Sequence, residues 1–256
     1  MADPVVTMIR DLGRRKGRER RNLAVAEGIR LVEEALAARI PFRAVATGPA
    51  LEGTSRGQSL KSNLRAAGVA LTELSDKELS ELADTEHPQG VIAVVEPPAW
   101  SLEQLDPGPR GVVLVLDGIQ DPGNVGTMIR TAHALGAAGV IALKGTADLT
   151  NPKVMRGSMG SCFRLPALLA EDEAFDAWRT ARRVELHVAA MDGMPLRQWK
   201  PSRAVALVMG NEGAGARETL LARAAARVAI PIRAEAESLN VAVAAGILLF
   251  EVLDGR

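Results

Sequence analysis

The chain has 256 residues, of which 47% are apolar, and its 31 Lys and Arg residues balance 31 Asp and Glu residues. This length allows one large domain or two modest ones with proper cores, and we expect two. Zero net charge gives no sign of nucleic acid or membrane from bulk electrostatics, and the single cysteine excludes an internal disulfide and a multi-cysteine zinc site.

The first predicted feature is a basic segment. Seven Lys and Arg residues lie between Arg10 and Arg21, against two carboxylates. A solvated helix face and a surface that contacts phosphates both fit this composition.

Helical and strand patterns then alternate up to residue 96, which predicts a small α/β domain over residues 1–96. The predicted elements are a helix around Ile29–Leu36, a strand at 42–47, helices at 60–67 and 77–83, and strands at 69–74 and 90–95. Residues 97–110 are rich in turn-forming residues and indicate a linker.

From residue 111 onward the alternation becomes regular, which predicts an α/β domain with a parallel sheet covered on both faces, over residues 111–256. Its predicted strands are 112–116, 140–143, 186–190, 204–208 and 228–230, with a helix at 217–226. The last helix, 239–253, is apolar around much of its circumference, so it is either deeply buried or covered by a second subunit.

No apolar run reaches transmembrane length, and the N-terminus lacks the apolar core of a signal peptide. The histidines, His87, His133 and His187, have no metal-ligand spacing. We therefore expect a soluble, cytoplasmic protein with no membrane contact and no metal.

The first turn of interest follows the strand at 112–116. Asp121-Pro122-Gly123 breaks the chain, and Asn124 can cap the helix that follows. The free N–H groups at such a helix start suit phosphate or carboxylate. Arg130 comes about a turn and a half later on the same helix.

A second turn, Gly210-Asn211-Glu212-Gly213-Ala214-Gly215, follows the strand at 204–208. Its glycine order differs from the Gly-x-Gly-x-x-Gly fingerprint of dinucleotide-binding proteins, which argues against a nicotinamide or flavin cofactor. A tight connection without function remains an alternative.

The third turn runs through Ile230-Pro231 to Ser238-Leu239-Asn240-Val241. Ser238 can cap the last helix. The amide of Asn240 needs a partner at an apolar helix start, and that partner could be a ligand.

These residues resemble, in order and spacing, the three motifs of the SpoU/TrmH RNA 2′-O-ribose methyltransferases of the SPOUT class. The motifs are residues 121–126 with Arg130, residues 209–213, and residues 230–231 with 238–241. Three motifs over about 120 residues are more specific than one glycine loop. Residues 15–18, 26–28, 33–36 and 87–94 resemble the L30e-like substrate-binding domain that many members carry.

The resemblance implies a C-terminal trefoil knot and an S-adenosylmethionine cofactor. Main chain at Gly210, Ile230 and Leu239 would line the adenosine pocket, with Ala189 and Met191 adding to its wall. Knots are very rare, so periodicity alone predicts none.

The resemblance also makes Arg130 the central catalytic residue. A guanidinium stays protonated in proteins, so we favour a role as a clamp on the phosphate next to the target ribose over a role as base, with phosphate or water accepting the proton. Asn124 would orient the ribose or Arg130, Glu212 would pair with an arginine or the substrate, and Ser238 and Asn240 would fix the pocket.

The resemblance implies an RNA partner, with 23S rRNA of the large ribosomal subunit as the favoured substrate. It also implies a homodimer whose active sites form across the interface. Aromatic residues are 3% and tyrosine is absent, so recognition should depend on shape and phosphates. The candidate RNA contacts are Arg15, Lys16, Arg18, Arg156 and Ser158. For the last two, an ordinary cationic loop is the alternative.

Other functions remain open from the sequence. A tRNA 2′-O-methyltransferase or an rRNA methyltransferase that confers antibiotic resistance would share this plan. A noncatalytic RNA-binding protein of the same fold would not need Arg130, Glu212 and Asn240, and all three are present. A dinucleotide oxidoreductase is disfavoured by its missing fingerprint.

Overall fold

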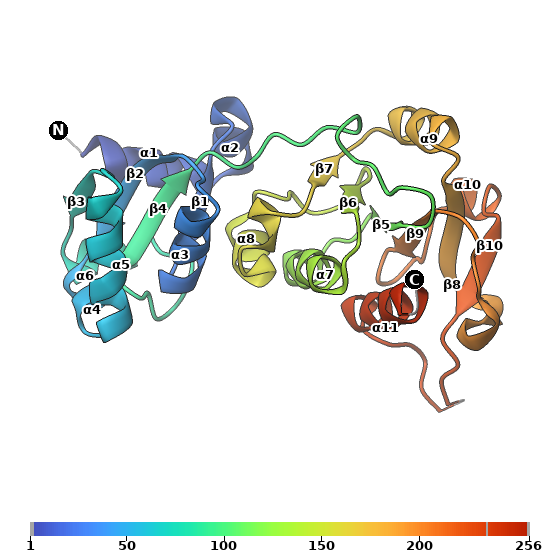
Figure 1. The fold of residues 1–256 in the computed structure, drawn as a ribbon. Coiled ribbons are helices and arrows are strands. Elements are labelled where there is room, and N and C mark those ends of the chain that lie inside the picture. The colour runs from blue at the N-terminus through green and yellow to red at the C-terminus, as the bar shows by residue number, and fades with distance from the viewer. Residues whose placement is uncertain (1–2, 234, 255–256) are drawn as a thin grey trace. The chain divides into compact units, whose positions relative to one another are not determined.

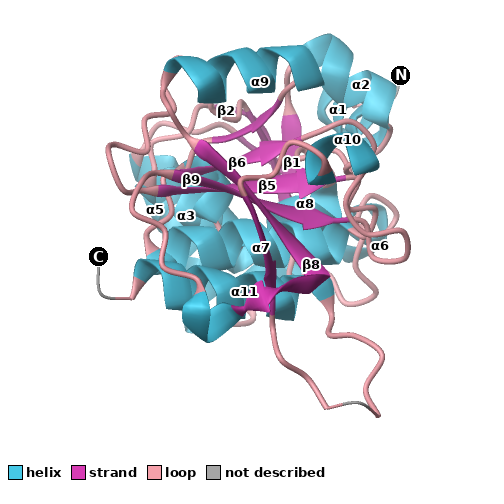
Figure 2. Cartoon of the chain, turned by 90° about the vertical axis from the view of Figure 1, so that its right-hand side faces the viewer, coloured by secondary structure: helices cyan, strands magenta, loops and turns pink. Residues whose placement is uncertain are grey.

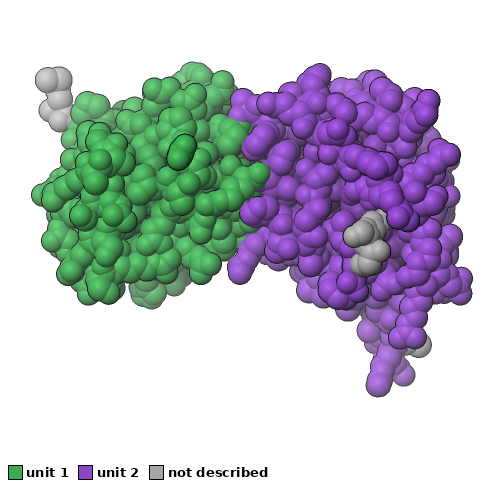
Figure 3. Space-filling model, in the orientation of Figure 1, with its two compact units in different colours: residues 1–98, 150–164 green, residues 99–149, 165–256 purple. Residues whose placement is uncertain are grey.

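The computed structural model describes residues 3–233 and 235–254. Its contacts divide the chain into two units, coloured in Figure 3: Met1–Pro98 with Thr150–Arg164, and Ala99–Leu149 with Leu165–Arg256. The predicted α/β class is confirmed for both. No helix in the described part of the chain has the length and apolarity needed to cross a membrane.

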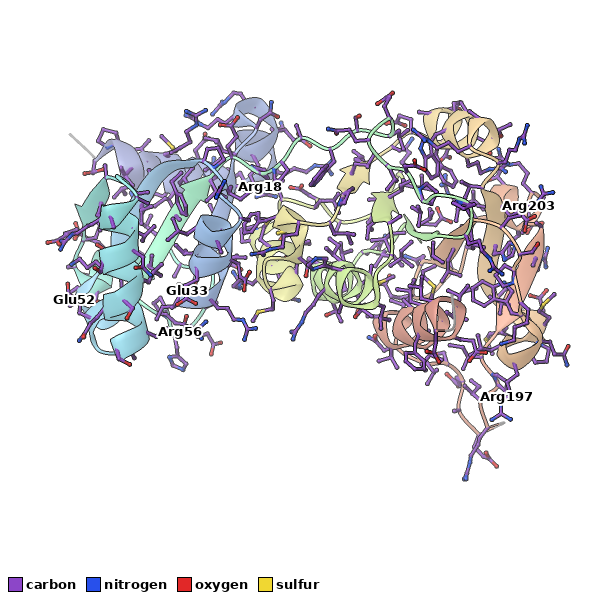
Figure 4. All side chains as sticks on the ribbon, viewed as in Figure 1. Arg18, Glu33, Glu52, Arg56, Arg197 and Arg203 are labelled. Atoms are coloured by element: carbon purple, nitrogen blue, oxygen red, sulfur yellow. The ribbon has the colours of Figure 1, made fainter. Side chains whose placement is uncertain are left out.

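The first unit is built on a mixed four-stranded sheet of order β1-β4-β2-β3, in which only β2 and β3 run parallel. Its elements, coloured blue to green in Figure 1, are α1 (Pro4–Leu12), α2 (Arg15–Arg21), β1 (Ala24–Glu27), α3 (Ile29–Ala37), β2 (Phe42–Thr47), α4 (Pro49–Glu52), α5 (Ser55–Ala66), β3 (Leu71–Glu73), α6 (Asp76–Ser80) and β4 (Val91–Val95). Strand β1 was not predicted. Helices α3 and α5 are joined by the ion pair between Glu33 and Arg56, both labelled in Figure 4.

The segment Thr150–Arg164 packs with the first unit although the sequence division placed it in the C-terminal domain. It contains α8 (Pro152–Ser158) and the 3₁₀ turn η1 (Ser161–Phe163). Met155 and Phe163 belong to the apolar core of the first unit. The chain leaves the second sheet after the strand Gly139–Ala142, forms this segment and re-enters the sheet at Ala167–Leu169. Burial of Met155 and Phe163 stabilises the segment in the first unit.

The second unit has a six-stranded sheet of order β10-β8-β9-β5-β6-β7, and all its strands are parallel, as predicted. Its elements are β5 (Val112–Asp117), α7 (Pro122–Leu135), β6 (Gly139–Ala142), β7 (Ala167–Leu169), α9 (Asp172–Ala181), β8 (Glu185–Pro195), η2 (Leu196–Gln198), β9 (Val205–Gly210), α10 (Glu218–Leu221), β10 (Ala226–Ala229) and α11 (Val241–Leu253). Strand β7 was not predicted, and α10 is shorter than the predicted helix because the chain turns after Leu221 to enter β10.

Helices cover both faces of this sheet, as Figure 2 shows, with α9 on one side and α7 with α11 on the other. Phe175 and Trp178 of α9 belong to the same apolar core as the alternate residues Val113 and Val115 of β5. Every residue of β5 is buried, which is the pattern of a central parallel strand. The two covering layers leave the strand ends open for a site.

Helix α11 is buried on one face only. Ala245, Leu248 and Leu249 are inaccessible, whereas Val243 and Phe250 are 53% and 57% exposed. The sequence left deep burial and cover by a second subunit as alternatives for this apolar helix, and the exposed side chains show that deep burial is wrong.

Candidate functional site

Strands β5 and β9 are neighbours whose carboxyl ends lie side by side, with Asp117 paired to Gly210. The strand order reverses here, since β6 and β7 follow β5 on one side and β9, β8 and β10 lie on the other. Ligands of open parallel sheets bind outside the carboxyl ends of the strands at such a switch point. The first and second predicted turns both begin here.

A chain of hydrogen bonds joins the three turns. The Asn240 amide Nδ2 donates to Asn124 Oδ1 at 3.1 Å, and Asn124 Nδ2 donates to Glu212 Oε1 at 3.1 Å. Residues separated by more than 80 positions in sequence are thus in direct contact. Because each amide is both donor and acceptor, the chain fixes the orientation of Asn124.

Glu212 accepts hydrogen bonds from amide groups of the first turn. Within residues 3–233 and 235–254 it pairs with no arginine, which was one of the two predicted partners. Besides Asn124, the main-chain N–H groups of Gln120 and Asp121 donate to its carboxylate at 3.2 and 3.3 Å. Burial opposes ionisation of Glu212, but these donors outweigh it and hold the pKa of Glu212 below its ordinary value. Glu212 is therefore a fixed carboxylate that holds the first turn.

Two predicted helix caps are wrong. Asp121, not Asn124, is the N-cap of α7, because its Oδ1 accepts from the Asn124 N–H at 2.8 Å. Asn240, not Ser238, is the N-cap of α11, and its Oδ1 accepts from the N–H groups of Ala242 and Val243. The first correction leaves the side chain of Asn124 available for its contacts. In the second, Asn240 caps with Oδ1 and still donates to Asn124 through Nδ2.

A cavity of about 410 Å³ opens beside this chain of hydrogen bonds, within the second unit. Its walls come from the ends of β8, β9 and β10 and from the start of α11. All five residues predicted to bind the cofactor line it: Ala189, Met191, Gly210, Ile230 and Leu239. Glu212, Ser238 and Asn240 also line it.

The glycine at position 210 is required by the packing of the chain on itself. A Cβ at Gly210 would lie 2.0 Å from the main-chain nitrogen of Ala216 and 2.2 Å from the carbonyl carbon of Gly215. The close approach that requires glycine is thus made by the chain's own returning loop, and the loop in turn forms the cavity wall.

Arg130 lies on an exposed face of α7 and is not among the residues that line the cavity. Asn124 is six residues earlier, so the two side chains point about 120° apart around the helix. Across residues 3–233 and 235–254, Arg130 forms no ion pair. Arg130 is thus an exposed cation on the helix beside the cavity.

The candidate RNA contacts fall into two groups. Arg15 and Lys16 are exposed, although Arg15 pairs with Glu19 at 2.6 Å. Arg18, labelled in Figure 4, is 4% exposed and donates to the carbonyl oxygens of Leu12 and Gly13 at 2.9 and 3.1 Å. Arg18 is therefore satisfied within the first unit, and it is not accessible for a phosphate contact.

Arg156 and Ser158 of α8 also form their contacts with residues of the first unit. Arg156 binds Glu27 at 3.2 Å and Asp84 at 2.6 Å. Ser158 is fully buried, and its hydroxyl donates to the carbonyl oxygen of Met155 at 2.8 Å. These contacts favour a structural role for both residues.

Sequence reasoning missed the contribution of Asn211. Its Nδ2 donates to the carbonyl oxygen of Gly118 at 2.8 Å, and its Oδ1 accepts from the N–H groups of Gly213 and Ala214. An asparagine directly after one glycine and two residues before another is a signal for such a turn-stabilising contact. Asp117 and Arg217 were also missed, and they are described below.

The parallel sheet, the switch-point cavity and the amide contacts beside it define an α/β protein with a site for a nucleotide-like cofactor. Residues 111–250 match the model of the SpoU rRNA Methylase family, and residues 3–93 match the MRM3-like substrate binding domain. The chain belongs to the SpoU rRNA methylase family of S-adenosylmethionine-dependent RNA 2′-O-methyltransferases.

Relatives extend over most of the chain. It is 35% identical, over 93% of its length and 91% of the relative's, to the Bacillus subtilis 23S rRNA (guanosine(2553)-2′-O)-methyltransferase RlmP. The AdoMet-bound rRNA methyltransferase of Sinorhizobium meliloti is 34% identical with a TM-score of 0.86, covering 98% of this chain and 94% of that one. The SpoU methyltransferase AviRb of Streptomyces viridochromogenes, in complex with AdoMet, is 29% identical with a TM-score of 0.89 and full coverage of both chains.

The cavity has the chemistry that S-adenosylmethionine requires. Its volume is in the range of cofactor pockets, and its walls are mainly apolar, as an adenine ring needs. The lining also includes Asn211, Glu212, Ser238 and Asn240, whose polar groups could serve the ribose and amino-acid parts of the cofactor. The residues present therefore fit this cofactor.

Proposed function

We propose that this protein methylates a ribose 2′-hydroxyl of 23S rRNA. The identity of 35% over nearly the whole chain with a relative of that specificity supports the substrate. The hydrogen-bond chain from Asn240 through Asn124 to Glu212, beside an apolar cavity, is the observation that carries the reaction.

S-adenosylmethionine supplies a methyl group on a positively charged sulfur. Ala189, Met191, Gly210, Ile230 and Leu239 would hold it and exclude water. Asn124 would orient the ribose, because its amide is fixed from both sides. Glu212, Ser238 and Asn240 would keep that arrangement, so that orientation provides most of the rate.

Arg130 would bind the phosphate next to the target ribose and stabilise the negative charge that develops on the oxygen. Its guanidinium is exposed and has no ion pair among the described residues, which suits it to this role. Phosphate or water would accept the proton.

We further propose a homodimer in which Arg130 of one protomer meets the cavity of the other. The exposed apolar stripe of Val243, Ile247 and Phe250 supports a second copy as the occupant of this face. A groove between α7 and α11 continues the stripe and includes Asn124 and Asn240. The interface would thus adjoin the site.

Mixed dimers test this arrangement. A mixture of Arg130→Ala and Leu239→Asp protomers should recover about a quarter of wild-type activity, because half of randomly formed dimers are mixed and each has one intact site. If each site belongs to one protomer, the mixture stays inactive.

The domain division that we propose is a substrate-binding domain over residues 1–96, a linker over 97–110 and a catalytic domain over 111–256, with Arg15 and Lys16 on the RNA-binding surface.

We also propose that the C-terminal segment forms a trefoil knot, which the family resemblance supports. Mechanical unfolding would test the knot, since a knotted chain extends to less than its full contour length.

The direct test of function is transfer of tritiated methyl groups to 23S rRNA, followed by mapping of the 2′-O-methylated nucleotide. One resistant position in alkaline hydrolysis is expected. Methylation on a base, or no transfer to any rRNA, would contradict the proposal.

A further inference from the structure

Asp117 is a buried carboxylate at the end of β5, and Arg217 satisfies both of its oxygens. The side chain of Asp117 is 0% exposed, so an unpaired charge there would be strongly unfavourable. Arg217 Nε donates to Oδ1 at 2.5 Å, and the main-chain N–H of Arg217 donates to Oδ2 at 2.8 Å. Side chain and main chain of one residue are therefore fixed at the switch point.

The same guanidinium also binds Asp172 at the start of α9. Nη1 and Nη2 donate to its two oxygens at 2.6 and 2.9 Å, which is the two-pronged geometry that arginine forms with carboxylates. This contact lowers the pKa of Asp172 and raises the pKa of Arg217. Arg217 is thus attached to two separate elements, β5 and α9.

The loop that ends at Arg217 carries part of the cavity wall. It leaves β9 at Gly210 and closes on itself, since Asn211 and Gly215 exchange main-chain hydrogen bonds at 3.0 and 2.9 Å. Asn211 and Glu212 lie inside this loop and reach the first turn. One end of the loop is anchored by β9, and the other is anchored by Arg217.

We propose that Arg217 is a positioning residue that holds loop 211–216 in its cofactor-binding shape through Asp117 and Asp172. Arg217 does not line the cavity, so it acts through Asn211 and Glu212. A loop held in place before binding loses less entropy when the cofactor enters. This inference rests on the proposed function.

The test compares Arg217→Met with Arg223→Met. Arg223 is a matched control because it also pairs with a carboxylate of α9, Asp176, at 2.7 Å, and its other side-chain hydrogen bond goes to the carbonyl oxygen of Thr219, outside loop 211–216. The measurements are the dissociation constant of S-adenosylmethionine by calorimetry, kcat, and KM for 23S rRNA.

Arg217→Met should weaken cofactor binding by about tenfold and lower kcat, with KM for RNA changed less than about twofold. Arg223→Met should change none of these by more than about twofold, and Arg217→Lys, which keeps one ionic contact, should lie between. If Arg217→Met binds cofactor as wild type does, even with a lower melting temperature, the inference is wrong and Arg217 only stabilises the fold.

If Arg217→Met does not fold, Asp172→Asn decides the matter, because it leaves Asp117 paired and weakens only one half of the contact. A roughly threefold weaker cofactor affinity is expected, and an unchanged affinity overturns the inference. Failure of the proposed function would look different, since the wild-type protein itself would then bind no S-adenosylmethionine or methylate no rRNA.

Discussion

Asn240 has two separable roles, as the cap of α11 and as the donor to Asn124. Asn240→Ala removes both. Loss of an N-cap costs about 1 kcal/mol, and loss of a partly exposed hydrogen bond to Asn124 costs about 0.5 kcal/mol. The sum of about 1.5 kcal/mol should lower the melting temperature by roughly 3–6 °C. Methyl transfer to 23S rRNA should also fall, by about three- to tenfold, because Asn124 is no longer oriented.

Asn240→Asp separates the two roles. Aspartate caps helices as well as asparagine does, so only the contact with Asn124 is lost and the melting temperature should fall by roughly 1–2 °C, less than in Asn240→Ala. It has no N–H to donate, and it puts a negative charge against Asn124 Oδ1. The rate of methyl transfer should therefore fall at least as far as in Asn240→Ala. An Asn240→Asp protein with wild-type kcat would refute the reasoning that the contact with Asn124 serves the reaction.

Three further outcomes follow from the contacts. Arg18→Ala should destabilise the first unit by about 2 kcal/mol in urea unfolding, since two carbonyl groups lose a charged donor, whereas Arg15→Ala should change stability by less than about 0.5 kcal/mol. Burial raises the pKa of the Cys162 thiol to about 11, so at pH 8 only about 0.1% is thiolate, and alkylation in the folded protein should be far slower than in urea. The pKa of Glu212 is lowered in the folded state, so its contribution to stability is present above the unfolded value near 4.5 and lost as pH falls through the folded pKa. The unfolding free energy of Glu212→Gln should therefore depend less on pH below about pH 4.5 than that of wild type. Equal pH dependence of the two proteins would contradict this.

The fold was largely predictable where patterns are long. The run Val112–Asp117 is apolar and β-branched, and it is a central strand. The strands β1 (Ala24–Glu27) and β7 (Ala167–Leu169) read Ala-Val-Ala-Glu and Ala-Leu-Leu, so they have little of the β-branched content that marks the equally short β6 (Gly139–Ala142). Segment 150–164 carries no signal that it would pack with the first unit, since that depends on tertiary burial of Met155 and Phe163.

The cavity residues Gly210, Ile230 and Leu239 were predictable because the family motifs carry them, but the hydrogen bonds beside the cavity were not. Two residues can each cap a helix by sequence, and the choice of Asp121 over Asn124, or of Asn240 over Ser238, depends on the neighbouring turns. The pairing of Asp117 with Arg217 joins residues 100 positions apart. The register of β5 and β9 pairs Asp117 with Gly210, where the loop that ends at Arg217 begins.

The central claim is that three distant turns form one site in which the cofactor is bound by the cavity and the ribose is activated beside Arg130. It is tested most directly by measuring S-adenosylmethionine binding and methyl transfer to 23S rRNA side by side on Arg130→Ala, with the exposed Arg203→Ala as control. We predict that Arg130→Ala abolishes transfer and leaves the cofactor dissociation constant within about twofold of wild type, while Arg203→Ala alters neither. Equal loss of binding and transfer in Arg130→Ala, or full transfer without this cation, would contradict the account.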